Sequence, residues 1–147
     1  MHSNIYTAIQ APALNIVSAY EFIADPGHGG TSVFQGTVRN FNFGKEVIGV
    51  SYDVFEPLAI KNFTDLSFEA IEQWGEHLKI YITHASGRLN VNDISIIIGV
   101  SAVHRDEAFK ASRFLIEGIK HQSPIWKQEH YVDGNSEWVQ GHALCQH

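Results

Sequence analysis

Apolar residues recur at helical spacing in three segments of the chain. Residues 57–75 begin with Pro57, which suits the first turn of a helix. Residues 105–121 carry apolar side chains on one face and charged side chains on the other, and Pro124 follows soon after. A shorter helical pattern covers residues 14–24. The spacing therefore predicts two main helices and one short helix.

Strands are indicated where apolar and polar residues alternate, or where β-branched residues run together. Residues 94–103 are almost entirely apolar and rich in isoleucine, which is typical of a strand that is covered on both faces. Phe43-Gly44-Lys45 is a plausible hairpin turn between two neighbouring strands, and Asp133-Gly134-Asn135 is another. The remaining strands are predicted over residues 4–9, 31–40, 47–56, 78–85, 126–132 and 137–140.

These elements do not follow a strict strand–helix–strand alternation, so the predicted fold class is α+β. A length of 147 residues is typical of one domain, and we expect residues 1–147 to form it. The domain should contain a mixed or antiparallel sheet, two main helices packed on that sheet, and a C-terminal β-hairpin.

Composition excludes several classes of protein. Hydrophobic residues make up 44% of the chain and charged residues 18%, which argues against disorder. The net charge of −6 makes general binding to nucleic acid or to an anionic membrane surface unfavourable. The single cysteine, Cys145, excludes a disulfide framework, and no apolar run reaches the ~20 residues of a membrane helix. We therefore expect a cytoplasmic protein.

Positive charge is concentrated in one stretch of this acidic chain. Residues 101–127 contain five basic and three acidic residues, whereas the rest contains five basic and thirteen acidic ones. His104 and Arg105 stand where the buried strand is followed by a helix, and helix N-termini favour anions. An anionic ligand is expected to bind this stretch.

Each cation also has a purely structural explanation. Lys120 lies in the last turn of a helix, where it complements the helix dipole. Lys127 could face water opposite Trp126, and Arg39 could pair with one of the acidic residues. Arg105 is the partial exception, since a cation at a helix N-terminus is locally unfavourable.

Other chemistry has little support in the sequence. His142, Cys145 and His147 could chelate a metal, but they lie at the end of the chain, so no metal site is predicted. Gly27-His28-Gly29-Gly30 lacks the lysine of a phosphate-binding loop and precedes a strand, which favours a plain turn. A metal-binding protein is therefore a remote hypothesis.

Three blocks and a closing pair of residues, taken together, resemble one family. The blocks are Phe-Gln-Gly-Thr-Val-Arg-Asn at 34–40, Gly-Val-Ser-Ala-Val-His-Arg at 99–105, and Ile-Lys-His-Gln-Ser-Pro-Ile-Trp-Lys-Gln-Glu at 119–129, with Trp138-Val139 after them. In order and spacing they are similar to the large, catalytic subunits of molybdopterin synthase over about residues 30–139. That family has an acidic residue and an arginine soon after Trp-Val, where this chain has Gln140-Gly141-His142.

The resemblance implies a sulfurtransferase with a hammerhead-like α/β fold. Its substrate would be cyclic pyranopterin monophosphate, and its sulfur donor the thiocarboxylated C-terminal Gly-Gly of a small, ubiquitin-like subunit. Two sulfur transfers would produce the dithiolene of molybdopterin, within the biosynthesis of the molybdenum cofactor. The resemblance also implies a homodimer of this chain within a heterotetramer, and no cofactor for this step.

The resemblance assigns roles to residues in all three blocks. Lys120 would be the principal catalytic residue and Lys127 a supporting one, because a lysine beside other cations can act in acid–base catalysis. The substrate-binding residues implied are Thr37, Val38, Arg39, His104, Arg105, Lys120, Lys127, Gln128 and Glu129. The alternative is a non-catalytic module that binds an anionic peptide tail or a phosphorylated ligand through the same basic patch.

Overall fold

The computed structural model describes residues 3–139, which form nine strands and three helices within that part of the chain. In chain order these elements are β1 (Ile5–Gln10), α1 (Ile16–Ile23), β2 (Gly30–Thr37), β3 (Phe41–Asn42), β4 (Lys45–Val54), α2 (Glu56–Trp74), β5 (Lys79–Ala85), β6 (Gly87–Asn90), β7 (Ile94–Ala102), α3 (Arg105–Gln122), β8 (Ile125–Tyr131) and β9 (Ser136–Trp138). The α+β class and both main helices are confirmed.

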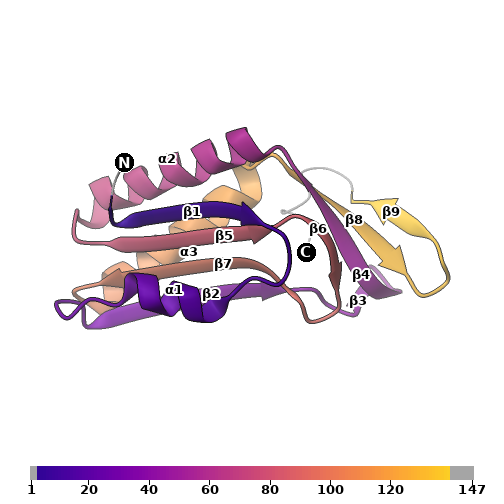
Figure 1. Ribbon diagram of the computed structural model, residues 1–147, viewed down its shortest axis with the longest axis horizontal. Helices are drawn as coiled ribbons and strands as arrows, with labels where there is room; N and C mark the ends of the chain where they lie inside the picture. Colours follow the sequence, from indigo (N-terminus) through magenta and orange to yellow (C-terminus); the bar gives the residue numbers. More distant parts are fainter. Residues whose placement is uncertain (1–2, 140–147) are drawn as a thin grey trace.

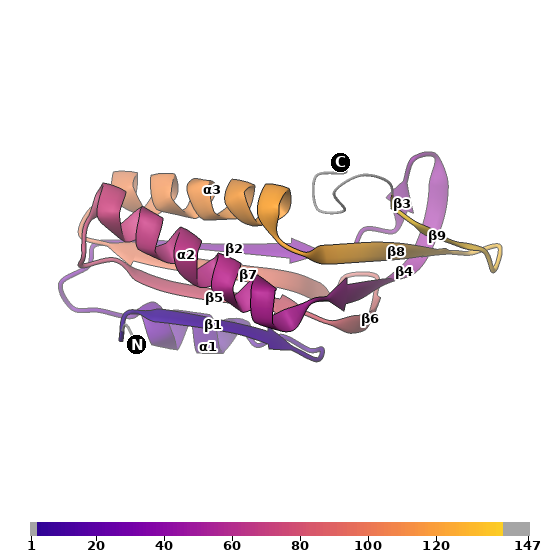
Figure 2. The same cartoon turned by 90° about the horizontal axis from the view of Figure 1, so that it is seen from above.

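The first sheet has the strand order β1-β5-β7-β2 (Figure 1). β1 runs parallel to β5, while β7 is antiparallel to both of its neighbours. Helices α2 and α3 pack on one face of this sheet, and the short α1 packs on the other (Figure 2). No helix in the described part of the chain is long and apolar enough to span a membrane.

Strand β7 shows why its sequence is almost continuously apolar. Successive side chains of a strand point to opposite faces. Ile96 and Ile98 belong to the core beneath α2 and α3, whereas Ile97 belongs to the core on the α1 side. The predicted strand with two covered faces is therefore confirmed.

The second sheet extends from one end of this helix-covered layer (Figure 1). Its strands follow the order β3-β4-β8-β9, and β6 pairs with β4. The predicted C-terminal hairpin is confirmed, since β8 and β9 are antiparallel neighbours. Strand β6 has no counterpart among the predicted elements.

In the first predicted hairpin, the strand that pairs with β4 is β3 and not β2. Phe43 and Gly44 form its turn with φ angles of 52° and 77°, as a two-residue turn of mirror-image type requires. Only the two residues of β3 pair with β4 there, because β2 ends at Thr37 and pairs with β7 in the other sheet. The chain between β2 and β3 thus crosses from one sheet to the other.

Candidate active site

A polar pocket lies where the two sheets meet. It is lined from the end of β2, from β3, and from the facing strands β4 and β8, and it is partly open to solvent. The lining residues are Thr37, Val38, Arg39, Asn42, Val50, Tyr52, Lys127 and Glu129.

One of the residues that line this pocket has a buried carboxylate. Glu129 is 3% exposed. Its Oε2 accepts a hydrogen bond of 2.7 Å from Nδ2 of Asn42, and its Oε1 accepts one of 3.2 Å from the hydroxyl of Tyr131. Burial and the neighbouring Glu129 carboxylate raise the pKa of Tyr131 to about 12, so this hydroxyl remains a donor at neutral pH. Both oxygens of the carboxylate are therefore held by hydrogen-bond donors of the protein.

Lys127 lies beside this carboxylate with its side chain only 14% exposed. Its Nζ is 3.8 Å from Oε2 of Glu129. Burial lowers the pKa of Lys127, and the positive charges of Arg39 and Lys120 lower it further, while Glu129 acts in the opposite direction. A lysine in such surroundings releases its proton more readily than a lysine in water, which suits acid–base chemistry.

Two further cations approach the same pocket. Arg39 lies two residues after the end of β2, and its Nη2 donates a hydrogen bond of 3.3 Å to Oδ1 of Asn42. Lys120 comes from the last turn of α3 and lies close enough to Lys127 to influence its charge. Three cations around one carboxylate make the pocket suitable for an anion.

His104 and Arg105 lie at the opposite end of the molecule. Gly30 pairs with Ala102 across β2 and β7, whereas Thr37 pairs with Ile94 at the other end of the same ladder. Seven residues of strand separate these ends by ~23 Å. Within one chain, His104 and Arg105 are therefore not part of the Lys127 pocket.

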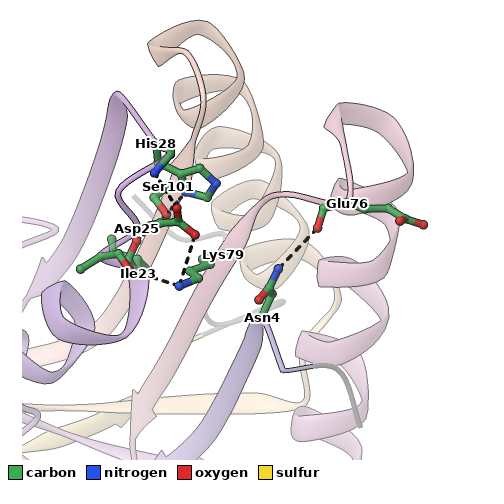
Figure 3. Close-up of polar contacts among 9 residues, drawn as sticks. Asn4, Ile23, Asp25, His28, Glu76, Lys79 and Ser101 are labelled. Atoms are coloured by element: carbon green, nitrogen blue, oxygen red, sulfur yellow. Dashed lines mark hydrogen bonds and ion pairs between the residues drawn. The ribbon is translucent and has the colours of Figure 1, made fainter.

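The start of α3 is instead packed against the loop that precedes β2. An added Cβ on Gly30 would lie 2.6 Å from the backbone nitrogen of Arg105, so only glycine fits there without a shift. Nδ1 of His28 lies 2.7 Å from Oγ of Ser101, which itself donates to the carbonyl of Ile23 at 2.6 Å (Figure 3). The glycine-rich loop thus has a structural role at this end.

Gln128 also lies apart from the pocket. It stands between Lys127 and Glu129 on β8, so its side chain points to the opposite face of the strand. There its Nε2 donates a hydrogen bond of 2.9 Å to Oγ of Ser136. Its predicted role in substrate binding stays a prediction.

The pocket contains residues that sequence reasoning missed. Asn42 and Tyr52 line it, and Tyr52 packs edge-on against the buried ring of His84 at 4.9 Å. Arg39 and Asn42 are three residues apart in the sequence, but this spacing indicates that their side chains meet only when the short β3–β4 hairpin is known. Within residues 3–139, no group of three or more His, Cys, Asp or Glu side chains is placed to hold a metal ion. His142, Cys145 and His147 lie outside the described residues.

Comparisons with known proteins find related sequences and a related structure. The family model described as MoaE protein matches residues 9–122. The molybdopterin synthase catalytic subunit of Synechococcus elongatus is 46% identical over 129 residues, which cover 88% of this chain and 78% of that protein. The protein of the same name from a Nostoc species is 36% identical and covers 90% and 80%. A crystal structure of molybdopterin synthase from Staphylococcus aureus superposes with a TM-score of 0.85, at 34% identity, over 91% of this chain and 96% of that one.

Proposed function

The chain belongs to the MoaE family, and we propose that it binds the substrate of its sulfur transfer in the pocket lined by Arg39, Asn42, Lys127 and Glu129. It is an enzyme of molybdenum cofactor biosynthesis, a sulfurtransferase that acts as a catalytic subunit of molybdopterin synthase. Sulfur passes from a thiocarboxylate on the C-terminus of a small partner subunit to cyclic pyranopterin monophosphate. A cytoplasmic location for this reaction remains a prediction.

The charge of the pocket is the observation that carries the proposal. Both the thiocarboxylate and the cyclic phosphate are anions, and transfer of sulfur from an acyl group develops further negative charge. Arg39 and Lys127 line one pocket, with Lys120 near Lys127. A guanidinium can bind phosphate through two parallel hydrogen bonds, so we assign Arg39 to substrate binding.

The two lysines are assigned to the reaction itself. Lys127 has a lowered pKa because it is buried and lies near Arg39 and Lys120, so it can exchange a proton with a reacting group. Lys120 lies near Lys127, on the last turn of α3. We propose that Lys120 stabilises the negative charge that develops during transfer and that Lys127 moves the proton.

His104 and Arg105 would reach this pocket only from a second copy of the chain. The resemblance implies a homodimer as well as substrate contacts by these two residues, while one chain holds them ~23 Å from the end of β2 that precedes Arg39. A two-fold dimer that brings the start of α3 of one copy to the pocket of the other would satisfy both expectations. We propose this composite site.

The first test is reconstitution of the reaction. The chain is mixed with a thiocarboxylated small subunit and cyclic pyranopterin monophosphate, and molybdopterin is measured as its fluorescent oxidised derivative. We expect Lys120→Ala and Lys127→Ala to abolish product formation. Lys110→Ala, which removes an exposed lysine of α3 paired with Asp106, is the matched control and should retain activity. Full activity of Lys127→Ala would refute the assignment, and a stable complex of the wild type without product would favour the binding module.

The second test uses mixed dimers. One chain carries Lys127→Ala and the other carries His104→Ala with Arg105→Ala, and dimers with both chains are purified through two different tags. Each homodimer should be inactive, whereas the mixed dimer keeps one intact site and should show about half of the wild-type activity. Inactive mixed dimers would exclude the composite site.

A further inference from the structure

Asn42 occupies an unusual position between two charged groups of opposite sign. Its side chain is 7% exposed on β3. Its oxygen accepts a hydrogen bond from Arg39 and its nitrogen donates one to Glu129. A guanidinium can only donate and a carboxylate can only accept, so the orientation of the amide is fixed by its two partners. A primary amide is the uncharged side-chain group that offers both functions in this geometry.

Asn42 and Lys127 approach the same oxygen atom. Oε2 of Glu129 is 2.7 Å from the amide nitrogen of Asn42 and 3.8 Å from Nζ of Lys127. Charge-assisted hydrogen bonds between an ammonium and a carboxylate are typically 2.7–2.9 Å long, so the lysine does not make one here. Lys127 and Glu129 lie two residues apart on one face of β8, within reach of each other.

We propose that Asn42 is a positioning residue for the sulfur transfer: its amide holds Glu129 towards Arg39 and so prevents the carboxylate from pairing closely with Lys127. This inference rests on the proposed function of the pocket. The hairpin turn at Phe43 and Gly44 follows Asn42 directly and fixes β3 against β4, so the amide reaches the carboxylate from a defined place.

The consequence for catalysis lies in the proton affinity of Lys127. The groups that surround it are those of β2, β4, β8 and α3, namely Arg39, Tyr52, Glu129, Tyr131 and Lys120. Among these only Glu129 favours the charged lysine by its own charge. If Asn42 is removed, the carboxylate is no longer held towards Arg39 and the ion pair with Lys127 shortens. An opposite charge at close range raises the pKa of a lysine.

The test measures the pKa of Lys127 without using activity. The full chain is labelled with trace acetic anhydride across a series of pH values, and acetylation of Lys127 is quantified by peptide mass spectrometry. In Asn42→Ala the pKa of Lys127 should rise by about one unit. Asn42→Asp also cannot donate to the carboxylate, but it adds a negative charge that raises the pKa of Lys127 by itself, so Asn42→Ala is the informative variant.

A double-mutant cycle separates positioning from general damage to the fold. In a Glu129→Gln background the carboxylate is absent, so Asn42→Ala should leave the pKa of Lys127 unchanged. Leu78→Ala, which opens a cavity in the core beneath α2 and α3, is a destabilised control and should leave that pKa unchanged as well. Equal labelling curves for wild type and Asn42→Ala would overturn the proposal, and so would an equal rise in both backgrounds.

Activity then separates this proposal from the proposed function. In the reconstituted reaction, the limb of the pH profile of kcat that belongs to Lys127 should move to higher pH in Asn42→Ala, by the same amount as the labelling curve. A wild type without turnover would refute the proposed function while the labelling result still stands. A wild type that turns over, with a kcat profile unaltered by Asn42→Ala, would refute the positioning role alone.

Discussion

His84 makes the stability of the fold depend on pH in a way that can be calculated. Its side chain is buried on β5, Nδ1 lies 2.7 Å from the carbonyl oxygen of Ala85, and the ring packs edge-on against Tyr52. Burial lowers the pKa of His84 to about 4, although the hydrogen bond to Ala85 opposes this effect. An exposed histidine has a pKa near 6.5.

The direction in which pH changes the stability depends on whether the folded or the unfolded state binds the proton. Between about pH 6.5 and pH 4 the unfolded chain is protonated at this residue and the folded protein is not, so acid favours unfolding. The stability contributed by neutral His84 is complete above about pH 6.5 and is lost as the pH falls to about 4. The gap of about 2.5 pH units corresponds to about 3 kcal/mol, at ~1.4 kcal/mol per unit.

The assay is urea denaturation of wild type and His84→Gln at several pH values from 7.5 to 4.5. Glutamine retains an N–H donor for the carbonyl of Ala85 but does not titrate. The variant loses some packing at every pH, so the informative quantity is the difference between the two free energies of unfolding. We expect wild type to lose about 2 to 3 kcal/mol more than the variant over this range.

A surface histidine provides the control. His121 has a side chain 57% exposed and lies 3.4 Å from Glu117, so His121→Gln is the same substitution at an exposed position. Its stability should remain parallel to that of wild type within about 0.5 kcal/mol. If the His84→Gln curve also remained parallel to wild type down to pH 4.5, the argument from burial would be wrong.

Three further substitutions test packing and hydrogen bonding in three different parts of the fold. Gly30→Ala places a Cβ against the backbone of Arg105, so β2 and α3 must separate; we expect a loss of about 1–3 kcal/mol, measured by urea denaturation. Phe63→Ala removes a fully buried ring from the core and should cost about 3–5 kcal/mol in the same assay. Tyr131→Phe leaves Oε1 of Glu129 without its donor and should cost about 2 kcal/mol, visible as a lower Tm; an unchanged Tm would contradict the hydrogen bond.

The sequence alone predicts those elements whose buried faces can be recognised from the spacing of their own apolar residues. The long helices and the strand at β7 follow from local periodicity, because each buries a defined stripe or both faces. Strand pairing is different, since alternation does not specify a partner. β2 was paired with the wrong strand because Val38 makes its backbone hydrogen bonds with Asp93 and Asn92, which lie far away in sequence.

Prediction of the site was limited in the same way, because strand pairing cannot be deduced from the local sequence. Arg39, Lys127 and Glu129 were assigned through the resemblance, and all three line one pocket. Asn42 and Tyr52 were missed because their places depend on the register between β3, β4 and β8, which no local pattern contains. Strand β6 was missed for a similar reason, since it is short and has a single buried residue, Leu89.

The charges of α3 illustrate why a continuous basic stretch does not define one site. Lys110 and Arg113 form i,i+4 pairs with Asp106 and Glu117 on the exposed face, where such pairs contribute little and attract little. Lys127 differs from these two cations because its side chain is only 14% exposed.

Lys127 lies 3.8 Å from the buried carboxylate of Glu129, and Arg39 is linked to that carboxylate only through Asn42, so the pocket holds an excess of positive charge in a partly desolvated place. Such a charge is costly unless it is paired, and the pKa of Lys127 is lowered by burial and by its cationic neighbours for this reason. An anion that enters the pocket supplies the missing partner and favours the protonated lysine. Binding of the anion and protonation of Lys127 are therefore linked, and each must strengthen the other by the same free energy. On the proposal that the substrate binds here, it would supply this missing negative charge and favour the protonated form of Lys127 before the transfer.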